Sequence, residues 1–421
     1  MSASAPGYLL NAESSYPSKS IVVLGASGSV GSTTLSFLRS HNGSQEEKII
    51  LSGVSVHSSI DELRRILNEF SPQAAAISDS SVFDERADSL RADFPSCRFF
   101  RGEDGLVEMI GFCRSSGADT VLTAVVGASG IRATVESLNL NFKVALANKE
   151  TMVTAGPAIE NLLLAKRNEA PGDRPVIMPV DSEHNAVFQT LFAVKPEHIS
   201  RVILTASGGP FRDRSLETIL KATRKEVLNH PTWNMGPKIT VDSAGMINKG
   251  LEVIEARFLF SIEYDMLDVL IHRNSLVHGM VELKDGGYLM CASTPNMVFP
   301  IAHSLFYPDA VPARHKEAET PDAWKPIDFE PVSRHRFPGY ALCLQAARAG
   351  GTGPAIFNAA NEIAVEFFLE DKIKFSEIPR LIDSVLQDMP VEQGSELGLF
   401  LEADFRARSL ARSALKTIRG V

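Results

Sequence analysis

Short apolar runs alternate with amphipathic stretches through the first half of the chain. The apolar runs are rich in β-branched residues and most end near glycine, serine or asparagine, which is typical of buried strands. The stretches between them repeat apolar residues at helical spacing. Strands are predicted over residues 19–26, 49–56, 74–78, 97–100, 119–127 and 142–148, and helices over 32–40, 60–70, 84–94, 105–115 and 131–138. This alternation predicts a doubly wound, parallel α/β sheet.

The pattern changes after residue 180. Short strands at 201–206, 268–273, 275–283 and 287–292 surround a predicted helix at 244–259, which favours an α+β domain. Residues 307–336 are rich in proline and charge, as extended linkers are. Four amphipathic segments then predict a terminal four-helix bundle. We therefore expect a flexible tail (1–18), a Rossmann-like NADPH-binding domain (19–180), a catalytic and metal-binding domain (181–306), a linker (307–336) and a helical domain (337–421).

Composition narrows the function classes. The 421 residues are 44% hydrophobic and 22% charged, which is ordinary for a globular protein. A net charge of −9 argues against a general nucleic-acid binder. No stretch approaches the about 18 uninterrupted apolar residues of a membrane span. The four cysteines form no CxxC pair, and the first 18 residues match neither a secretory signal nor a transit peptide, so we expect a cytoplasmic protein.

A glycine-rich loop follows the first predicted strand. Gly25, Gly28 and Gly31 open the first predicted helix, where bare backbone N–H groups can hold a pyrophosphate. The spacing is GxxGxxG, so a turn without a ligand is the alternative. The second predicted strand ends at His57, Ser58 and Ser59, without the carboxylate that an NAD site places there. Because hydroxyls can donate to a 2′-phosphate, Ser58 and Ser59 favour NADP.

Two segments supply candidate metal ligands. Asp181 and Glu183 follow the apolar strand at 176–180, placed to share one hard cation, although a capped helix start explains them equally well. Helical spacing projects Asn248, Lys249 and Glu252 together, and the alternative is a solvated Lys–Glu pair. We interpret residues 239–241 as a strand, so that this second segment also begins at a strand end. Three carboxylates favour Mg²⁺ or Mn²⁺ over zinc.

Further polar clusters fit an anion-binding pocket. Ser207 precedes two glycines, in a turn that can hold a phosphate. His230, Trp233 and Met235 can bind a ligand and cover it, and Ser243 lies near the acidic segment. Taken one at a time, His230 is more often structural and Trp233 is more often core. Together they indicate an NADP enzyme with a divalent metal ion and a small phosphorylated substrate.

Six motifs carry a family resemblance. In chain order they are GASGSVG (25–31), ALANKE (145–150), VDSEHNA (180–186), TASGGPF (205–211), HPTWNMGPKITVDSAGMINKGLE (230–252) and GGTGPAIFNAANEIAV (350–365). With them the chain resembles the 1-deoxy-D-xylulose 5-phosphate reductoisomerase family. That family rearranges 1-deoxy-D-xylulose 5-phosphate and reduces the product with NADPH to 2-C-methyl-D-erythritol 4-phosphate, in the non-mevalonate pathway to isoprenoids.

The resemblance implies a homodimer and a role for each matching residue. The implied metal ligands are Asp181, Glu183 and Glu252, which would bind Mg²⁺ or Mn²⁺, with Co²⁺ as an alternative. The implied catalytic residues are these three acids and Lys149. The implied substrate contacts are Ser182, Ser207, His230, Trp233, Met235, Ser243, Asn248 and Lys249. The implied cofactor contacts are Ser27, Gly28, Ser29, Val30, Asn148, Glu150 and Gly236. The resemblance leaves open whether the rearrangement is a retro-aldol/aldol sequence or a ketol shift.

Two other classes of function remain as alternatives. One is an NADP oxidoreductase of similar layout, such as an aspartate-semialdehyde or a homoserine dehydrogenase. The aspartate-semialdehyde enzyme needs a reactive cysteine in its catalytic loop, and it is disfavoured because no cysteine lies beside the motifs. A catalytically inactive NADP-sensing protein would tolerate loss of the three carboxylates, yet all three are present.

Overall fold

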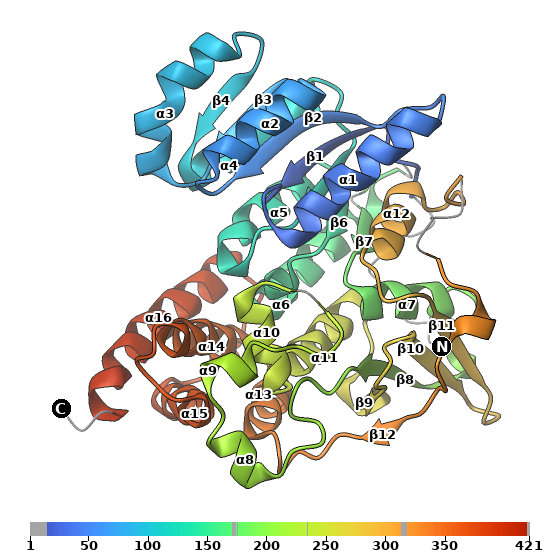
Figure 1. Cartoon of the computed structure of the whole chain (residues 1–421), viewed down its shortest axis with the longest axis vertical. Helices are drawn as coiled ribbons and strands as arrows, with labels where there is room; N and C mark the ends of the chain where they lie inside the picture. Colours follow the sequence, from blue (N-terminus) through green and yellow to red (C-terminus); the bar gives the residue numbers. More distant parts are fainter. Residues whose placement is uncertain (1–14, 171–173, 175, 234, 313–317, 419–421) are drawn as a thin grey trace.

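Seven parallel strands form the first sheet, as the sequence predicts. The computed structural model describes residues 15–170, 174, 176–233, 235–312 and 318–418. The strand order is β4-β3-β2-β1-β5-β6-β7, so the chain leaves β1 toward one edge and returns to the other (Figure 1). The strands are β1 (Ser20–Leu24), β2 (Ile50–Val56), β3 (Ala74–Ile77), β4 (Arg98–Arg101), β5 (Thr120–Thr123), β6 (Lys143–Leu146) and β7 (Val176–Pro179).

Helices cover both faces of this sheet because successive strand residues point to opposite sides. Ile21 and Val23 pack with α1 (Ser29–Ser44), α2 (Ile60–Phe70) and α3 (Ser80–Asp93). Val22 and Leu24 face the other core, with α4 (Gly102–Ser115), α5 (Ile131–Asn139) and α6 (Lys149–Ala165). The predicted doubly wound arrangement is therefore confirmed.

A second sheet of five strands lies below the first in Figure 1, in the order β11-β10-β8-β9-β12. Only the β8–β9 pair is parallel. Helix α7 (Ser182–Leu191) packs across it, and α12 (Val298–Phe306) returns to the first sheet beside α1. The strands are β8 (Ile199–Ala206), β9 (Leu267–Ile271), β10 (Val277–Leu283), β11 (Tyr288–Ala292) and β12 (Glu330–Pro331).

One local prediction is wrong. Residues 239–241 lie inside helix α10 (Pro237–Ala244), not in a strand. Gly236 at the N-cap and Pro237 at the first helical position start this helix, and that signal outweighs the β-branched run. The predicted helix 244–259 is also divided, because Met246 adopts a left-handed φ of 57° before α11 (Ile247–Phe260). Ser243 and Asn248 therefore come from two successive helices.

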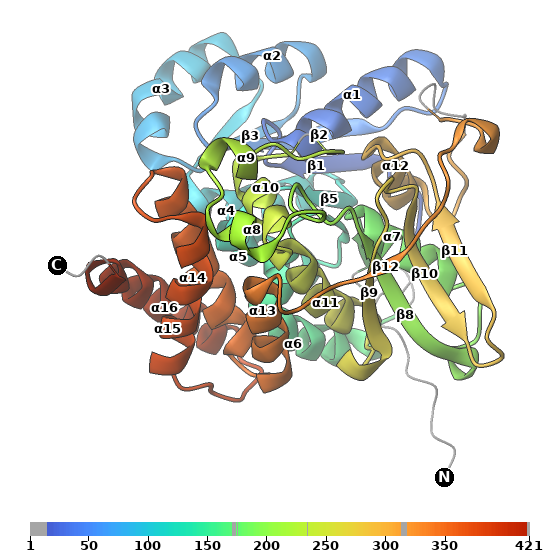
Figure 2. The ribbon, with the colours of Figure 1, turned by 60° about the horizontal axis from the view of Figure 1, so that its bottom comes forward.

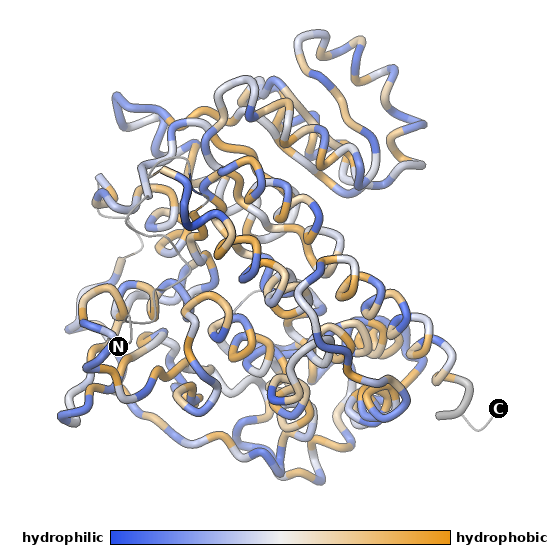
Figure 3. The backbone as a smooth tube through the Cα atoms, turned by 180° about the vertical axis from the view of Figure 1, so that it is seen from behind, coloured by the Kyte–Doolittle hydropathy of each residue, from blue (hydrophilic) through white to orange (hydrophobic). Residues whose placement is uncertain are grey.

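The C-terminal part is the predicted four-helix bundle. It comprises α13 (Pro338–Ala349), α14 (Gly353–Leu369), α15 (Ile378–Asp388) and α16 (Leu397–Ile418). Helix α14 packs against α15 and α16 and also against α6, so the bundle is joined to the rest of the molecule (Figure 2). Along the peripheral helices hydrophilic and hydrophobic segments alternate (Figure 3). Among the described residues, no helix combines the length and apolar character that crossing a membrane requires.

The last residues of the predicted flexible tail are anchored, so that prediction does not hold for residues 15–18. The backbone N–H of Ser18 donates to the carbonyl of Leu305 at 2.8 Å. The buried ammonium of Lys143 donates to the carbonyls of Tyr16 (2.6 Å), Leu305 (3.1 Å) and Tyr307 (3.0 Å). A buried cation needs such acceptors, and they hold this segment against α12. The rest of the predicted tail, residues 1–14, lies outside the described residues.

Candidate active site

Three chain segments meet at a cleft between the two sheets. Strand β7 ends at Pro179 and delivers Asp181 as the N-cap of α7, the start of α6 delivers Lys149, and α11 crosses beneath both. The cleft encloses about 960 Å³ and opens to solvent. Its lining includes fourteen of the predicted site residues: Ser29, Val30, Lys149, Asp181, Ser182, Glu183, Ser207, Trp233, Met235, Gly236, Ser243, Asn248, Lys249 and Glu252.

The three predicted metal ligands converge. One carboxylate oxygen from each of Asp181, Glu183 and Glu252 lies within 4.8 Å of the other two. Asp181 and Glu183 come from the start of α7. Glu252, far from both in sequence, comes from the middle of α11. Glu252 is 1% exposed, so its carboxylate needs a cationic partner.

Two lysines supply positive charge to these carboxylates. Lys149 Nζ lies 2.5 Å from Asp181 Oδ2 and 2.9 Å from Glu252 Oε1. Lys249 Nζ lies 2.8 Å from Glu183 Oε1 and also contacts the other oxygen of Glu252. Burial alone would lower the pKa of both lysines, but the facing carboxylates outweigh it and raise both pKa values. Both lysines are therefore held as ammonium groups in the cleft wall.

The acids are not electrostatically equivalent. Burial tends to raise the pKa of Asp181, but Lys149, His184 and Lys249 hold it well below its usual range. Burial raises the pKa of Glu183, which Lys249 only partly opposes. The three carboxylates that converge here offer an all-oxygen donor set, which suits Mg²⁺ or Mn²⁺.

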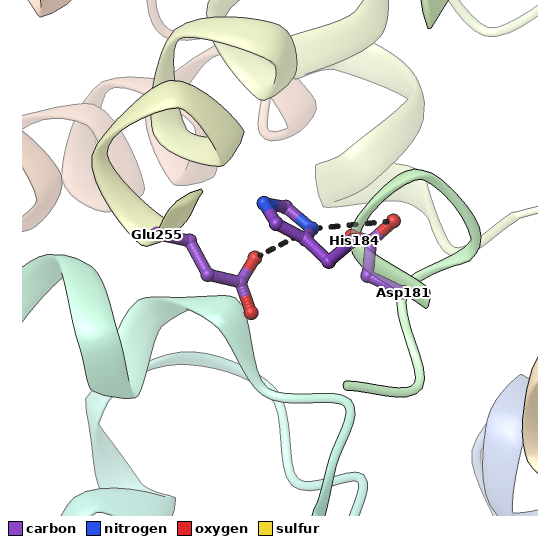
Figure 4. Close-up of side chains that lie close together, drawn as sticks. All are labelled: Asp181, His184 and Glu255. Carbon is purple, nitrogen blue, oxygen red and sulfur yellow. Dashed lines mark ion pairs between the residues drawn. The ribbon is translucent and has the colours of Figure 1, made fainter. Parts of the chain in front are cut away.

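A histidine and a fourth acid, which the sequence analysis did not select, lie directly behind the cluster. His184 and Glu255 are both fully buried, with His184 Nδ1 3.3 Å from Glu255 Oε2 and 4.0 Å from Asp181 Oδ1 (Figure 4). His184 Nε2 lies 2.8 Å from the backbone carbonyl of Glu252. The imidazole thus ties α7 to α11 beneath the predicted ligands. His184 follows Asp181 by three residues and Glu255 follows Glu252 by three, and this helical spacing was the signal in the sequence.

The predicted phosphate turn closes one side of the cleft. Ser207 Oγ lies 3.0 Å from His230 Nε2, which places both beside the cleft. Burial, with Arg212 nearby, lowers the pKa of His230 to about 4, so the ring is neutral near pH 7. Gly209 adopts a φ of +64°, and a Cβ on it would lie 2.5 Å from the Ser243 carbonyl oxygen. Glycine is thus required for the turn to approach α10 closely.

The nucleotide loop is built from close backbone contacts. Gly28 is the N-cap of α1, and its N–H donates to the Gly25 carbonyl at 3.1 Å. A Cβ on Gly31 would lie 2.3 Å from the Gly25 carbonyl oxygen, so the third glycine permits the loop to pack on the helix. Ser29 and Val30 reach the cleft, whereas Ser27 and Gly28 lie on the loop beside it.

Gly236, another predicted cofactor contact, lines the cleft, but Asn148, Glu150, Ser58 and Ser59 do not. Asn148 caps α6, accepting from the Thr151 N–H at 2.9 Å, and donates to the Gly127 carbonyl at 2.9 Å. Glu150 is 5% exposed and pairs with Lys238 at 3.0 Å. Ser58 and Ser59 lie in the exposed turn between β2 and α2, with Ser59 as the N-cap of α2.

Comparisons with known proteins show which family the chain belongs to. Three family models match: 1-deoxy-D-xylulose 5-phosphate reductoisomerase (residues 21–156), its C-terminal domain (177–260) and the DXP reductoisomerase C-terminal domain (292–410).

Curated relatives and solved structures match over nearly the whole chain. The reductoisomerase of Leptospira interrogans (serovar Lai, strain 56601) is 45% identical, over 94% of this chain and 97% of its own, and that of Listeria innocua is 38% identical, over 94% and 100%. A crystal structure of DOX-P reductoisomerase with NADPH, fosmidomycin and magnesium matches with a TM-score of 0.87, at 32% identity, over 95% of this chain and 99% of that one. The Zymomonas mobilis enzyme with NADPH matches with a TM-score of 0.82, at 33% identity, with the same coverage.

Proposed function

The chain belongs to the 1-deoxy-D-xylulose 5-phosphate reductoisomerase family, and from this premise we propose how its own residues carry out the reaction. The enzyme uses NADPH and a divalent metal ion to convert 1-deoxy-D-xylulose 5-phosphate to 2-C-methyl-D-erythritol 4-phosphate in the MEP pathway. The observation that carries the assignment of residues is the convergence of three acids and two lysines at one cleft.

Asp181, Glu183 and Glu252 would hold the metal ion, and Ser182 lies between the first two ligands. A bound ion would polarise the substrate carbonyl and stabilise negative charge on its oxygen. Lys149 has its ammonium within hydrogen-bond distance of two of the three ligands, so it can donate to a substrate oxygen beside them. We assign Lys149 to the reacting oxygens rather than to the phosphate.

We assign the phosphate group of the substrate to the wall of the cleft that carries Ser207, whose hydroxyl neutral His230 contacts. Asn248 and Lys249 add an amide and an ammonium group where this wall meets the metal-binding acids, which both side chains also contact. Ser243 extends the same wall from the end of α10. Holding a phosphate remote from the bonds that change lets its binding energy serve orientation.

Trp233 and Met235 line the mouth of the cleft, where their apolar surfaces exclude water from the reactive aldehyde. NADPH lies along the carboxyl edge of the first sheet. Its pyrophosphate binds the backbone of Ser27, Gly28, Ser29 and Val30, with Ser58 and Ser59 at the 2′-phosphate. Asn148, Glu150 and Gly236 border the nicotinamide end, where Asn148 and Glu150 act through backbone groups because their side chains are occupied.

We further propose a cytoplasmic homodimer in which residues 19–180 bind the cofactor, 181–306 carry the metal and substrate, 307–336 link them and 337–421 form the helical domain. Besides the family resemblance, the edge strand β11 supports a dimer. It carries Tyr288 and Met290, which are 46% and 47% exposed, beside unpaired backbone groups. An apolar edge strand favours pairing with a second copy. Sedimentation of the full chain checks this, since a monomer at micromolar concentration contradicts it.

Purified protein mixed with NADPH, Mn²⁺ and 1-deoxy-D-xylulose 5-phosphate tests the assigned activity. We expect the nicotinamide absorbance to fall only when all three are present. Oxidation that ignores the sugar phosphate, or no oxidation, would contradict the proposal. A Ser207→Ala variant should mainly raise the KM for the sugar phosphate, whereas a Lys149→Met variant should mainly lower kcat.

A further inference from the structure

A second buried ion cluster lies next to the catalytic one. Lys238, in the first turn of α10, extends to two acids from different elements. Its Nζ is 3.0 Å from Glu150 Oε1 on α6 and 2.8 Å from Asp242 Oδ2 on α10. Glu150 is 5% exposed and Asp242 is 1% exposed. None of these three side chains lines the cleft.

The cluster continues into the C-terminal bundle. Asn361 of α14 is fully buried, and its amide donates to Asp242 Oδ1 at 3.0 Å. Its neighbour Glu362 accepts from Arg408 of α16 at 2.8 Å. Polar contacts therefore connect Glu150 on α6, through Lys238 and Asp242 on α10, to Asn361 on α14. The Glu362–Arg408 pair, which joins α14 to α16, lies beside them.

The position of this chain relates it to catalysis. Glu150 directly follows Lys149, whose ammonium belongs to the catalytic cluster. Asp242 directly precedes Ser243, and Gly236 and Ile239, on either side of Lys238, line the cleft. Lys238 thus joins the helix that presents Lys149 to the helix that presents Ser243, yet does not itself line the cleft.

Electrostatics give Lys238 a second effect. Burial by itself would raise the pKa of Glu150. The charge of Lys238 and, to a smaller extent, that of Lys149 outweigh burial, so the pKa lies below its usual value. Glu150 is therefore a carboxylate that both lysines attract. The two neighbouring residues are held separately: Lys149 pairs with Asp181 and Glu252, and Glu150 pairs with Lys238.

We propose that Lys238 is a positioning residue: by bridging Glu150 and Asp242 it fixes α10 against α6 and keeps Lys149 directed to the metal-binding acids. The inference rests on the proposed function of Lys149 and of the cleft. Through Asn361, the C-terminal bundle contributes to the same alignment, so the bundle supports the active site as well as the fold.

A Lys238→Met substitution tests this at 25 °C. We expect kcat/KM for the sugar phosphate to fall by about 10- to 100-fold, since small misplacements of reacting groups have effects of that size. NADPH affinity, measured by nicotinamide fluorescence without turnover, should weaken as α10 shifts. Lys238→Arg should regain most of the loss, because a guanidinium can span two carboxylates. Lys221→Met, which removes an exposed Lys–Glu pair on α8 (Leu216–Leu220), is the matched control.

Three outcomes are decisive. A Lys238→Met enzyme that unfolds at lower temperature but keeps wild-type kcat, KM and NADPH affinity at 25 °C would show a structural role only and overturn the proposal. If this variant does not fold, Asp242→Asn keeps the test, because it removes the charge that attracts Lys238 and leaves one oxygen that can still accept a hydrogen bond. Asp242→Asn should lower kcat/KM for the sugar phosphate and weaken NADPH binding, each by less than Lys238→Met does. If neither quantity changes, the proposal is overturned. A wild-type protein that binds NADPH but does not convert the sugar phosphate would instead count against the proposed function.

Discussion

The buried acid cluster in the cleft, the catalytic end of the site, and the exposed turn at residues 57–59 outside the cleft lining, its proposed nucleotide end, are built on different principles. At the catalytic end the side chain of Glu252 is 2% exposed, and each of the three acids is fixed by an ammonium group from another part of the chain. At the nucleotide end the side chain of His57 is 75% exposed, and Ser58 and Ser59 occupy an open turn. The first geometry is imposed by the fold before any ligand arrives. The second leaves recognition to surface side chains, which can change without disturbing the core.

Replacing Glu252 by Gln should have the largest effect. The change replaces one of three carboxylate ligands by a neutral amide, whose single oxygen cannot pair with both Lys149 and Lys249 as the two oxygens of Glu252 do. We expect kcat/KM to fall by about 100-fold or more, since loss of one group that stabilises developing charge has effects of that order. Mn²⁺ affinity, followed by electron paramagnetic resonance, should fall as well.

The same variant sharpens the comparison of the two ends. NADPH affinity should stay within about twofold, because Glu252 lies outside the nucleotide loop and distant sites act independently. A loss of NADPH affinity equal to the loss of metal affinity would show that the two ends are not separable.

Gly209→Ala tests whether the phosphate turn depends on close backbone approach. A Cβ would meet the Ser243 carbonyl at 2.5 Å, and φ is +64°. We expect a loss of about 1–3 kcal/mol in the free energy of unfolding, the usual cost of such strain, and a raised KM for the sugar phosphate. Gly43→Ala is the control, because a Cβ there meets nothing within 4 Å. Equal unfolding free energies for the two variants would contradict the assigned geometry.

The same contrast explains what sequence could predict. The doubly wound parallel sheet follows from the apolar periodicity of the first half of the chain. Asp181, Glu183 and Glu252 were candidate metal ligands from their places after a strand or on a helix face, and the family resemblance assigned all three to one ion. The segment 239–241 was misassigned because β-branched residues also pack in short buried helices when Gly236 and Pro237 start them. His184 and Glu255 were missed because their spacing of three residues from Asp181 and Glu252 indicates a pair only when α7 and α11 are known to pack together.

Acid should destabilise the catalytic end more than the nucleotide end. Burial lowers the pKa of His278 on β10 to about 4, so the fold favours the neutral ring. Its contribution is intact above the unfolded pKa of about 6.5 and is lost as pH falls from there toward 4. The upper limit is about 3 kcal/mol, at about 1.4 kcal/mol per pKa unit. His278→Gln should flatten the decline in unfolding free energy over this range, measured by urea unfolding.

Ser58→Arg should give the smallest change and should act at the nucleotide end alone. The turn is exposed, so a guanidinium there pairs with a 2′-phosphate in water, where such a contact typically contributes about 1 kcal/mol. We expect the ratio of NADH to NADPH dissociation constants to rise about fivefold, an effect that weakens with added salt. Ser58→Met adds similar bulk without charge and should leave the ratio unchanged. Ser58 is exposed and its carbonyl, not its side chain, accepts from the Ile60 N–H, so kcat with saturating NADPH and the melting temperature should both stay at wild-type values. A ratio unmoved by the arginine would place the 2′-phosphate elsewhere, and a change in kcat would mean that even the open end of the site is coupled to the buried one.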